Sequence, residues 1–131
     1  VMKSDLAAGY TDFASMSALS FTAEAGSAGE SALEGAENYT AVSDQSAALL
    51  EVESGSADAC VIDATMAAAM TGAGTSYADL TVAAELTNEQ YGVAFRGGSD
   101  LCAELNSFMK DAKADGTLGA LAEKYGLTLA E

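Results

Sequence analysis

The stretch DACVID, residues 58–63, decides the fold of this chain. Its residues 59–62 are apolar without interruption, which is typical of a strand buried on both faces at the centre of a parallel sheet. Asp63 closes the strand, and Met66, Ala69 and Met70 then follow at helical spacing before Gly72. The stretch therefore predicts a central strand that leads directly into a helix, with Asp63 at the boundary.

Short strands and helices alternate on both sides of this stretch. Further strands are expected over residues 20–24, 39–42, 80–86 and 91–95, and further helices over residues 28–36 and 44–53. This alternation is typical of βαβ units, so we expect an α/β fold in which a small, mostly parallel sheet is flanked by helices.

The expected helix over residues 44–53 has clear end signals. Asp44 is a plausible N-cap, and Gly55 comes just past the end. Ala47, Leu50 and Val52 are predicted to face the core.

The last third of the chain is expected to be helical. Ser99 is the expected N-cap of the first helix, and Gly116 is expected to end it. Its apolar stripe consists of Leu101, Leu105, Phe108, Met109 and Ala112. A second helix places Leu118, Leu121, Ala122 and Tyr125 on one face before Gly126.

Length and charge bound the class of protein. The chain has 131 residues, enough for one core, and carries 5 Lys and Arg against 20 Asp and Glu, a formal net charge of −15. Recognition of phosphates needs clustered cations, so DNA, RNA and anionic membranes are disfavoured as partners. The longest uncharged stretch, residues 64–78, is too weakly apolar to predict a membrane-spanning helix.

The chain offers little for metal or nucleophilic chemistry. It has no His, and Cys60 and Cys102 lack the spacing of a metal site. We expect both cysteines to be small buried hydrophobic residues. No cofactor, no metal site and no catalytic residue are predicted, so a binding module is favoured over an enzyme.

The first candidate site is the turn between the first two expected elements. Gly26, Ser27, Ala28 and Gly29 lie where a strand meets a helix, so unpaired backbone N–H groups and the positive end of a helix dipole would converge there. Such a turn suits a carboxylate or a phosphate. A tight turn without a ligand explains the same residues, and the pattern matches neither a P-loop nor a dinucleotide-binding fingerprint.

The second candidate site consists of carboxylates at strand ends. Asp63 lies where a parallel strand meets its helix, the edge at which open α/β sheets bind ligands, and could pair with an ammonium group. Glu24, at the end of its strand, could contact a ligand side chain. The simpler alternatives are an N-cap for Asp63 and an exposed carboxylate for Glu24. Together, a carboxylate and an amide-lined turn would suit a zwitterion.

Four motifs carry a resemblance to a known family. They are FTAEAGSAGE at residues 21–30, SGSADACVID at 54–63, YGVAFR at 91–96, and a terminal helix pair containing DGTL at 115–118 and KYG at 124–126. In this order they resemble the polar amino-acid-binding proteins of bacterial ABC importers, which are extracytoplasmic solute-binding proteins.

The resemblance implies one lobe of the periplasmic-binding-protein-like II fold. Residues 1–131 would be the second lobe, with a hinge strand and lead-in at 1–20, a βαβ core at 20–96 and a C-terminal helix pair at 97–131. The missing first lobe of the same protein would supply an arginine for the ligand α-carboxylate. The partners implied are an amino acid and the ABC transporter permease. The protein would carry a signal peptide and would lie in the periplasm or, as a lipoprotein, on the cell surface.

Carried over to this sequence, the resemblance assigns roles to the candidate residues. Asp63 would receive the ligand α-ammonium group, the backbone around Ser27 and Ala28 would contact the α-carboxylate, and Glu24 would face the ligand side chain. Two lobes would close on the amino acid. The alternatives are a lobe of a related cyclohexadienyl-type dehydratase and a lobe of an extracellular amino-acid sensor.

Overall fold

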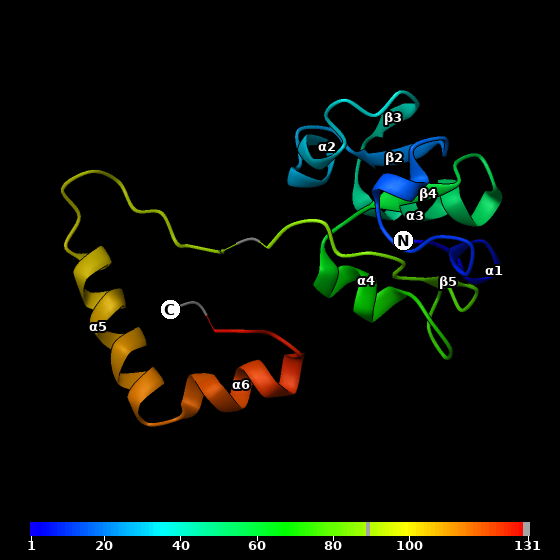
Figure 1. Ribbon diagram of the computed structural model, residues 1–131. Helices are drawn as coiled ribbons and strands as arrows, with labels where there is room; N and C mark the ends of the chain where they lie inside the picture. Colours follow the sequence, from blue (N-terminus) through cyan, green and yellow to red (C-terminus); the bar gives the residue numbers. More distant parts are fainter. Residues whose placement is uncertain (89, 130–131) are drawn as a thin grey trace. The chain divides into compact units, whose positions relative to one another are not determined.

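The computed structural model describes residues 1–88 and 90–129. The chain forms two compact units, Val1–Thr87 and Asn88–Glu131 (Figure 1). The assignment of both units to one lobe stays a prediction.

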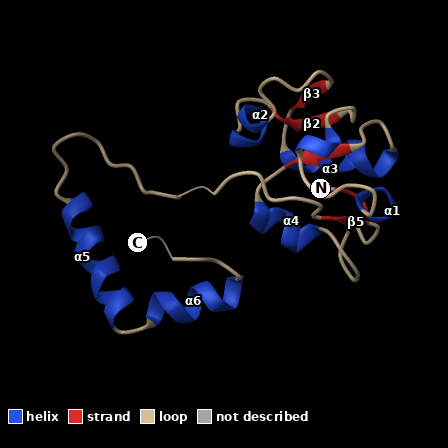
Figure 2. Ribbon diagram, in the orientation of Figure 1, coloured by secondary structure: helices blue, strands red, loops and turns tan. Residues whose placement is uncertain are grey.

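The first unit contains a sheet with helices around it (Figure 2). Its elements are β1 (Met2–Lys3), α1 (Ser4–Ala7), the 3₁₀ helix η1 (Ala14–Met16), β2 (Phe21–Glu24), α2 (Ala28–Ala32), β3 (Tyr39–Val42), α3 (Gln45–Ser54), β4 (Ala59–Val61), α4 (Ala64–Met70) and β5 (Leu80–Thr81). The expected α/β class is confirmed.

The sheet has five strands in the order β3-β2-β4-β1-β5. β2 pairs in parallel with both β3 and β4, so that Phe21 lies beside Tyr39 on one side and Ala59 on the other. β1 pairs antiparallel with β4 and with β5. The sheet is therefore mixed: the βαβ rhythm produced the parallel strands, and the two-residue strands β1 and β5 add antiparallel pairs.

Two apolar clusters cover the two faces of this sheet. On one face, Phe21, Ala23 and Ala59 pack with Met2 and Leu33, the residue that follows α2. On the other face, Cys60 and Leu80 pack with α3, and Met66 of α4 joins them. Consecutive residues of β4 alternate between the clusters, as a strand requires. As a result, α2 lies on one face, and α3 and α4 lie on the other.

The face of α3 differs from the prediction. Ala48, Leu49 and Val52 are buried, whereas Leu50 is 60% exposed. The prediction that Leu50 faces the core was wrong, because two adjacent leucines fit two helical phases and only the position of the sheet selects one. The ends of the helix are confirmed: Asp44 accepts a hydrogen bond from the Ala47 N–H, and Gly55 has φ = 80°.

Two expected strands are shorter or absent. Strand β5 ends at Thr81 instead of continuing through residue 86. Residues 91–95 form no strand, and Tyr91 and Val93 are 81% and 68% exposed. The prediction for 91–95 was wrong for the described chain because a strand needs a hydrogen-bonded neighbour, and no strand occurs among the described residues of the second unit.

The second unit is a helix pair, α5 (Leu101–Ala114) and α6 (Thr117–Tyr125), joined at Gly116 with φ = 85°. Asp100, not Ser99, is the N-cap of α5, although the Ser99 Oγ accepts a hydrogen bond from the Leu101 N–H at 3.3 Å. The buried helix residues of this unit, among those described, are Ala112 and Ala122. Large members of the expected apolar stripes remain exposed: Leu101, Phe108, Met109, Leu121 and Tyr125.

Candidate functional site

Three parallel strands end at one edge of the sheet, and a capped helix follows each. The caps are Ser27 after β2, Asp44 after β3 and Asp63 after β4. Because β2 lies between β3 and β4, these three caps belong to neighbouring strand ends. The sequence prediction that the turn at residues 26–29 and Asp63 share one edge of the sheet agrees with this topology.

The edge contains a topological switch point between β2 and β4. The chain leaves β2 into α2 on one face of the sheet, and it leaves β4 into α4 on the opposite face (Figure 1). Where neighbouring parallel strands send their helices to opposite faces, the loops diverge and a crevice forms outside the carboxyl ends. Open α/β sheets bind their ligands at this position.

A close backbone approach joins the two strand ends. Gly29 lies so near β4 that a Cβ atom on it would stand 2.7 Å from the Val61 carbonyl oxygen. Val61 precedes Asp63 by two residues. Only glycine fits at position 29 without a shift of the backbone, so the start of α2 is held directly against the end of β4, two residues before Asp63.

The turn itself is a capping structure. Gly26 adopts φ = 73°, a region that favours glycine, and the Ser27 Oγ accepts a hydrogen bond from the Glu30 N–H at 3.0 Å. In return, the Glu30 carboxylate accepts a hydrogen bond from the Gly26 N–H at 2.6 Å. This arrangement is close to a capping box, in which a serine and a glutamate three residues later satisfy each other's backbone groups.

Glu30 therefore occupies part of the predicted anion site. The Gly26 N–H already has a carboxylate partner within the chain, and the Ser27 N–H donates to the Glu24 carbonyl at 3.2 Å. Within the described residues, the N–H groups of Ala28 and Gly29 donate to no protein acceptor. The turn thus offers two amides to a ligand instead of four.

Tyr39 of the edge strand β3 holds the glutamate in place. Its hydroxyl donates to the Glu30 carboxylate at 2.9 Å. The Gly26 N–H and this hydroxyl stabilise the charged carboxylate and hold the pKa of Glu30 below its usual value. The same contact raises the pKa of Tyr39, because the nearby carboxylate disfavours a phenolate.

Asp63 is the N-cap of α4, as the simpler alternative predicted. One carboxylate oxygen accepts hydrogen bonds from the Thr65 and Met66 N–H groups at 2.8 and 3.2 Å, and also from the Thr65 hydroxyl. Capping alone explains an aspartate at this position. The role of Asp63 as a receiver of an ammonium group stays a prediction.

Gln45 fixes the backbone of Asp63. The Gln45 side-chain oxygen, at the first position of α3, accepts a hydrogen bond from the Asp63 N–H at 2.9 Å. The contact ties the loop after β4 to the helix after β3. Gln45 lies three residues before Ala48 and seven before Val52, on the buried stripe of α3, so its inward direction follows from the helical period.

Glu24 lies at the carboxyl end of β2, beside Val42 of β3, and is half-buried. It shares a face of the sheet with Thr22, because alternate residues of a strand point the same way. The expected contact between Glu24 and a ligand side chain stays a prediction.

Sequence reasoning did not predict the roles of three polar residues near the sheet. Glu30 and Gln45 complete the turn and the loop of the candidate site, and Thr22 is buried at the centre of β2. A serine followed three residues later by a glutamate is a capping-box signal that could have identified Glu30. The contacts of Gln45 and Thr22 are tertiary and leave no local signal.

The two cysteines have different environments. Cys60 is buried in β4, as expected, whereas Cys102 is exposed on α5 and its predicted burial was wrong. Burial raises the pKa of the Cys60 thiol to about 11. No group of side chains able to hold a metal ion occurs in residues 1–88 and 90–129. A search of the same residues finds no helix of sufficient length and apolarity to cross a membrane.

Comparisons of the chain with protein-family models, with curated proteins and with solved structures gave no match.

Proposed function

We propose that this chain is part of an extracytoplasmic amino-acid-binding protein of an ABC importer. The ligand is a polar amino acid, and the mechanism is the closure of the missing first lobe over the strand ends at the β2–β4 switch point. The permease would recognise the closed form, because a ligand that binds both lobes shifts the population toward closure.

The contact between Gly29 and Val61 carries the proposal. It brings the free amides of Ala28 and Gly29 to the end of the strand that leads to Asp63. Amides at the start of a helix attract a carboxylate, and a carboxylate attracts an ammonium group. Neighbouring strand ends therefore carry a group suited to each charge of one small zwitterion: the amides for its carboxylate and Asp63 for its ammonium group.

The surface of the second unit supports the proposal that another lobe packs against it. Its apolar side chains Phe108, Met109 and Tyr125 are 64%, 43% and 63% exposed. Several large exposed apolar side chains on one helix pair indicate an interaction surface. We assign this surface to the first lobe of the same protein, which the resemblance implies.

The Glu30 carboxylate makes this lobe a weak site when it acts alone. It already accepts the hydrogen bond from Gly26, and its negative charge opposes a second carboxylate at the turn. The arginine that the family resemblance places on the first lobe would offset that repulsion. Binding by the 131-residue chain is therefore expected to be in the millimolar range or weaker.

An NMR titration of the ¹⁵N-labelled chain tests the proposal. A panel of polar amino acids should shift the amide signals of Ala28, Gly29 and Thr65. The matching N-acetylated amino-acid amides, which lack both charges, should leave these signals unchanged. Asp63→Asn keeps a capping side chain but loses the negative charge, so it should remove the response without unfolding α4.

Two results would contradict the proposal. Shifts at these amides that are the same for the amino acid and for its N-acetylated amide would mean that no zwitterion is recognised. Micromolar affinity of the chain for one amino acid would mean that closure of two lobes is not required.

A further inference from the structure

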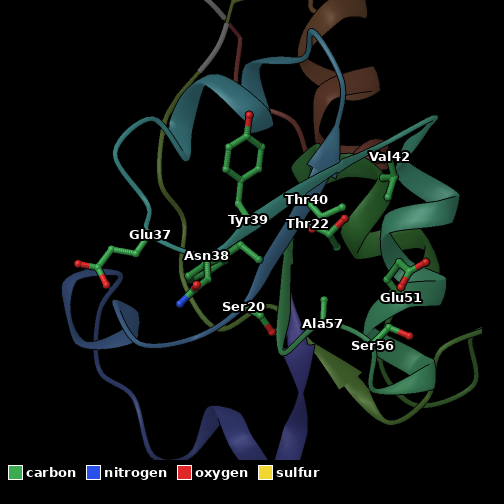
Figure 3. Close-up of a pocket in the computed structure, with 11 residues that line it drawn as sticks. Ser20, Thr22, Glu37, Asn38, Tyr39, Thr40, Val42, Glu51, Ser56 and Ala57 are labelled. Atoms are coloured by element: carbon green, nitrogen blue, oxygen red, sulfur yellow. The ribbon is translucent and has the colours of Figure 1, made fainter.

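A hollow begins at the amino-terminal ends of β2 and β3 and extends along β3 to Val42. It has a volume of about 380 Å³ and lies between these strands and the carboxyl-terminal half of α3 with the loop that follows (Figure 3). Ser20 and Asn38 mark its position, since both precede their strands. Neither residues 26–29 nor Asp63 line it, so this hollow goes beyond the proposed function.

Thr22, one of the residues that line this hollow, has a buried hydroxyl without a partner among the described residues. Thr22 is 1% exposed, and its Oγ1 is the buried side-chain polar atom that lacks a hydrogen bond among the described residues. Buried polar groups almost always have a partner, because leaving one unsatisfied costs free energy. Valine has the same shape and would avoid that cost. The fold alone gives no reason for a hydroxyl here, whereas a ligand does.

The polar groups around Thr22 define the chemistry of that ligand. Figure 3 shows Thr22 and Thr40 next to each other on adjacent strands. Glu51 of α3 and Ser56 of the loop that follows line the same hollow. Hydroxyl and carboxylate oxygens accept hydrogen bonds, and no lysine or arginine is found among the described lining residues. Val42 and Ala57 add apolar wall. The lining therefore favours a cation that donates hydrogen bonds and carries a short apolar part.

We propose that this hollow binds a small organic ammonium ion. Its ammonium group pairs with the Glu51 carboxylate, a second donor satisfies the Thr22 hydroxyl, and its methylene groups contact Val42 and Ala57. The charge of the chain helps, because a net charge of −15 raises the local concentration of cations. Glu51 is half-buried, so its attraction is less screened than that of a fully exposed carboxylate.

The test uses 1,4-diaminobutane as the probe in an NMR titration of the ¹⁵N-labelled full chain. Saturable shifts are expected at the amides of Thr22, Thr40 and Ser56. Glycerol, which is neutral, and butyrate, which is an anion, should leave these amides unshifted. Glu51→Gln should weaken binding at least about fivefold.

Two variants separate this site from general attraction to an acidic surface. Glu53→Gln removes the same charge from an exposed position on the same helix, and it should change the affinity less than about twofold. Thr22→Val should raise the melting temperature, because it removes an unpaired hydroxyl, and should nevertheless weaken the binding of the probe.

The proposal fails if the shifts are spread over the acidic surface without saturation, or if Glu51→Gln and Glu53→Gln weaken binding equally. It also fails if glycerol produces the same shifts as the diamine, which would indicate a site for neutral polyols. Unchanged affinity in a folded Thr22→Val variant would show that the Thr22 hydroxyl does not bind the probe, which also contradicts the proposal. All of these readings are independent of the response at Ala28, Gly29 and Thr65.

Discussion

Gly29 at the start of α2 and Val61 at the end of β4 are in backbone contact, and a Cβ on Gly29 would be 2.7 Å from the Val61 carbonyl oxygen. The contact fixes the spacing between the two strand ends that form the candidate site. It does so through backbone atoms, which cannot move aside as a flexible side chain can. The spacing of the strand ends at the switch point therefore depends on the absence of one methyl group.

Gly29→Ala should destabilise the first unit. The added methyl group must displace either α2 or the end of β4, and overpacking of this kind costs about 1–3 kcal/mol. Urea unfolding followed by circular dichroism measures the loss. Gly119→Ala is the matched control, because Gly119 lies inside α6 with nothing within 4 Å of its Cβ position, so alanine should be neutral or stabilising there. Equal effects of the two substitutions would contradict the close approach at Gly29.

Asp63→Ala should cost about 1 kcal/mol of stability, because it removes an N-cap side chain. The aspartate accepts hydrogen bonds from the Thr65 and Met66 N–H groups, and an alanine leaves both donors unsatisfied. Asp63→Asn retains an oxygen acceptor and should stay within a few tenths of a kcal/mol of the parent chain. Thermal unfolding of both variants checks the difference. A large loss with asparagine would show that the negative charge itself stabilises the fold.

The contact between Glu30 and the turn should make stability depend on pH. The Gly26 N–H and the Tyr39 hydroxyl lower the pKa of Glu30 in the folded chain. The resulting stabilisation is present above the unfolded pKa and is lost as the pH falls through the folded pKa. Melting temperatures of the parent chain and Glu30→Gln should therefore differ at about pH 6, and the difference should shrink as the pH falls through the folded pKa of Glu30.

Other carboxylates with lowered pKa values also titrate in this range, among them Asp44 and Asp58. The relevant quantity is therefore the difference between the parent chain and the variant at each pH. Tyr39→Phe removes one of the two hydrogen bonds to Glu30 and should reduce this difference without abolishing it. A difference that does not vary with pH would contradict the assigned cause.

The two cysteines should react at very different rates. Cys60 is buried and its pKa is raised to about 11, so at about pH 8 it is almost entirely the unreactive thiol. Cys102 is exposed on α5. A thiol reagent should modify one cysteine of the native chain rapidly, and the Cys102→Ser variant should react only when the first unit unfolds. Rapid modification of that variant under native conditions would contradict the burial of Cys60.

Local signals predicted the ends of the elements well, because a cap depends on residues within one turn of it. Asp44, Asp63 and Gly55 were all assigned correctly on this basis. The parallel arrangement of β2, β3 and β4 followed from the βαβ rhythm, and it brought the turn at residues 26–29 and Asp63 to one edge. That part of the candidate site was predictable.

The remaining features depend on distant partners. The hydrogen bond between Tyr39 and Glu30 joins an edge strand to a helix, and the one between Gln45 and Asp63 joins two helix starts, so neither is visible in a local pattern. Residues 91–95 have the composition of a strand, but a strand forms only beside another. Sequence alone could not state whether that neighbour is present.

The pair Leu49 and Leu50 gives the sharpest test of the helical phase of α3. Leu49 is 0% exposed and packs with Cys60 and Leu80, whereas Leu50 is 60% exposed. Leu49→Ala should therefore cost about 2–5 kcal/mol, because it leaves a cavity between α3 and the sheet. Leu50→Ala makes the same chemical change on the solvent side of the same helix and should stay within about 0.5 kcal/mol of the parent chain. Denaturant unfolding of both variants measures the contrast, and a larger loss for Leu50→Ala would mean that the helix presents its other face to β2 and β4.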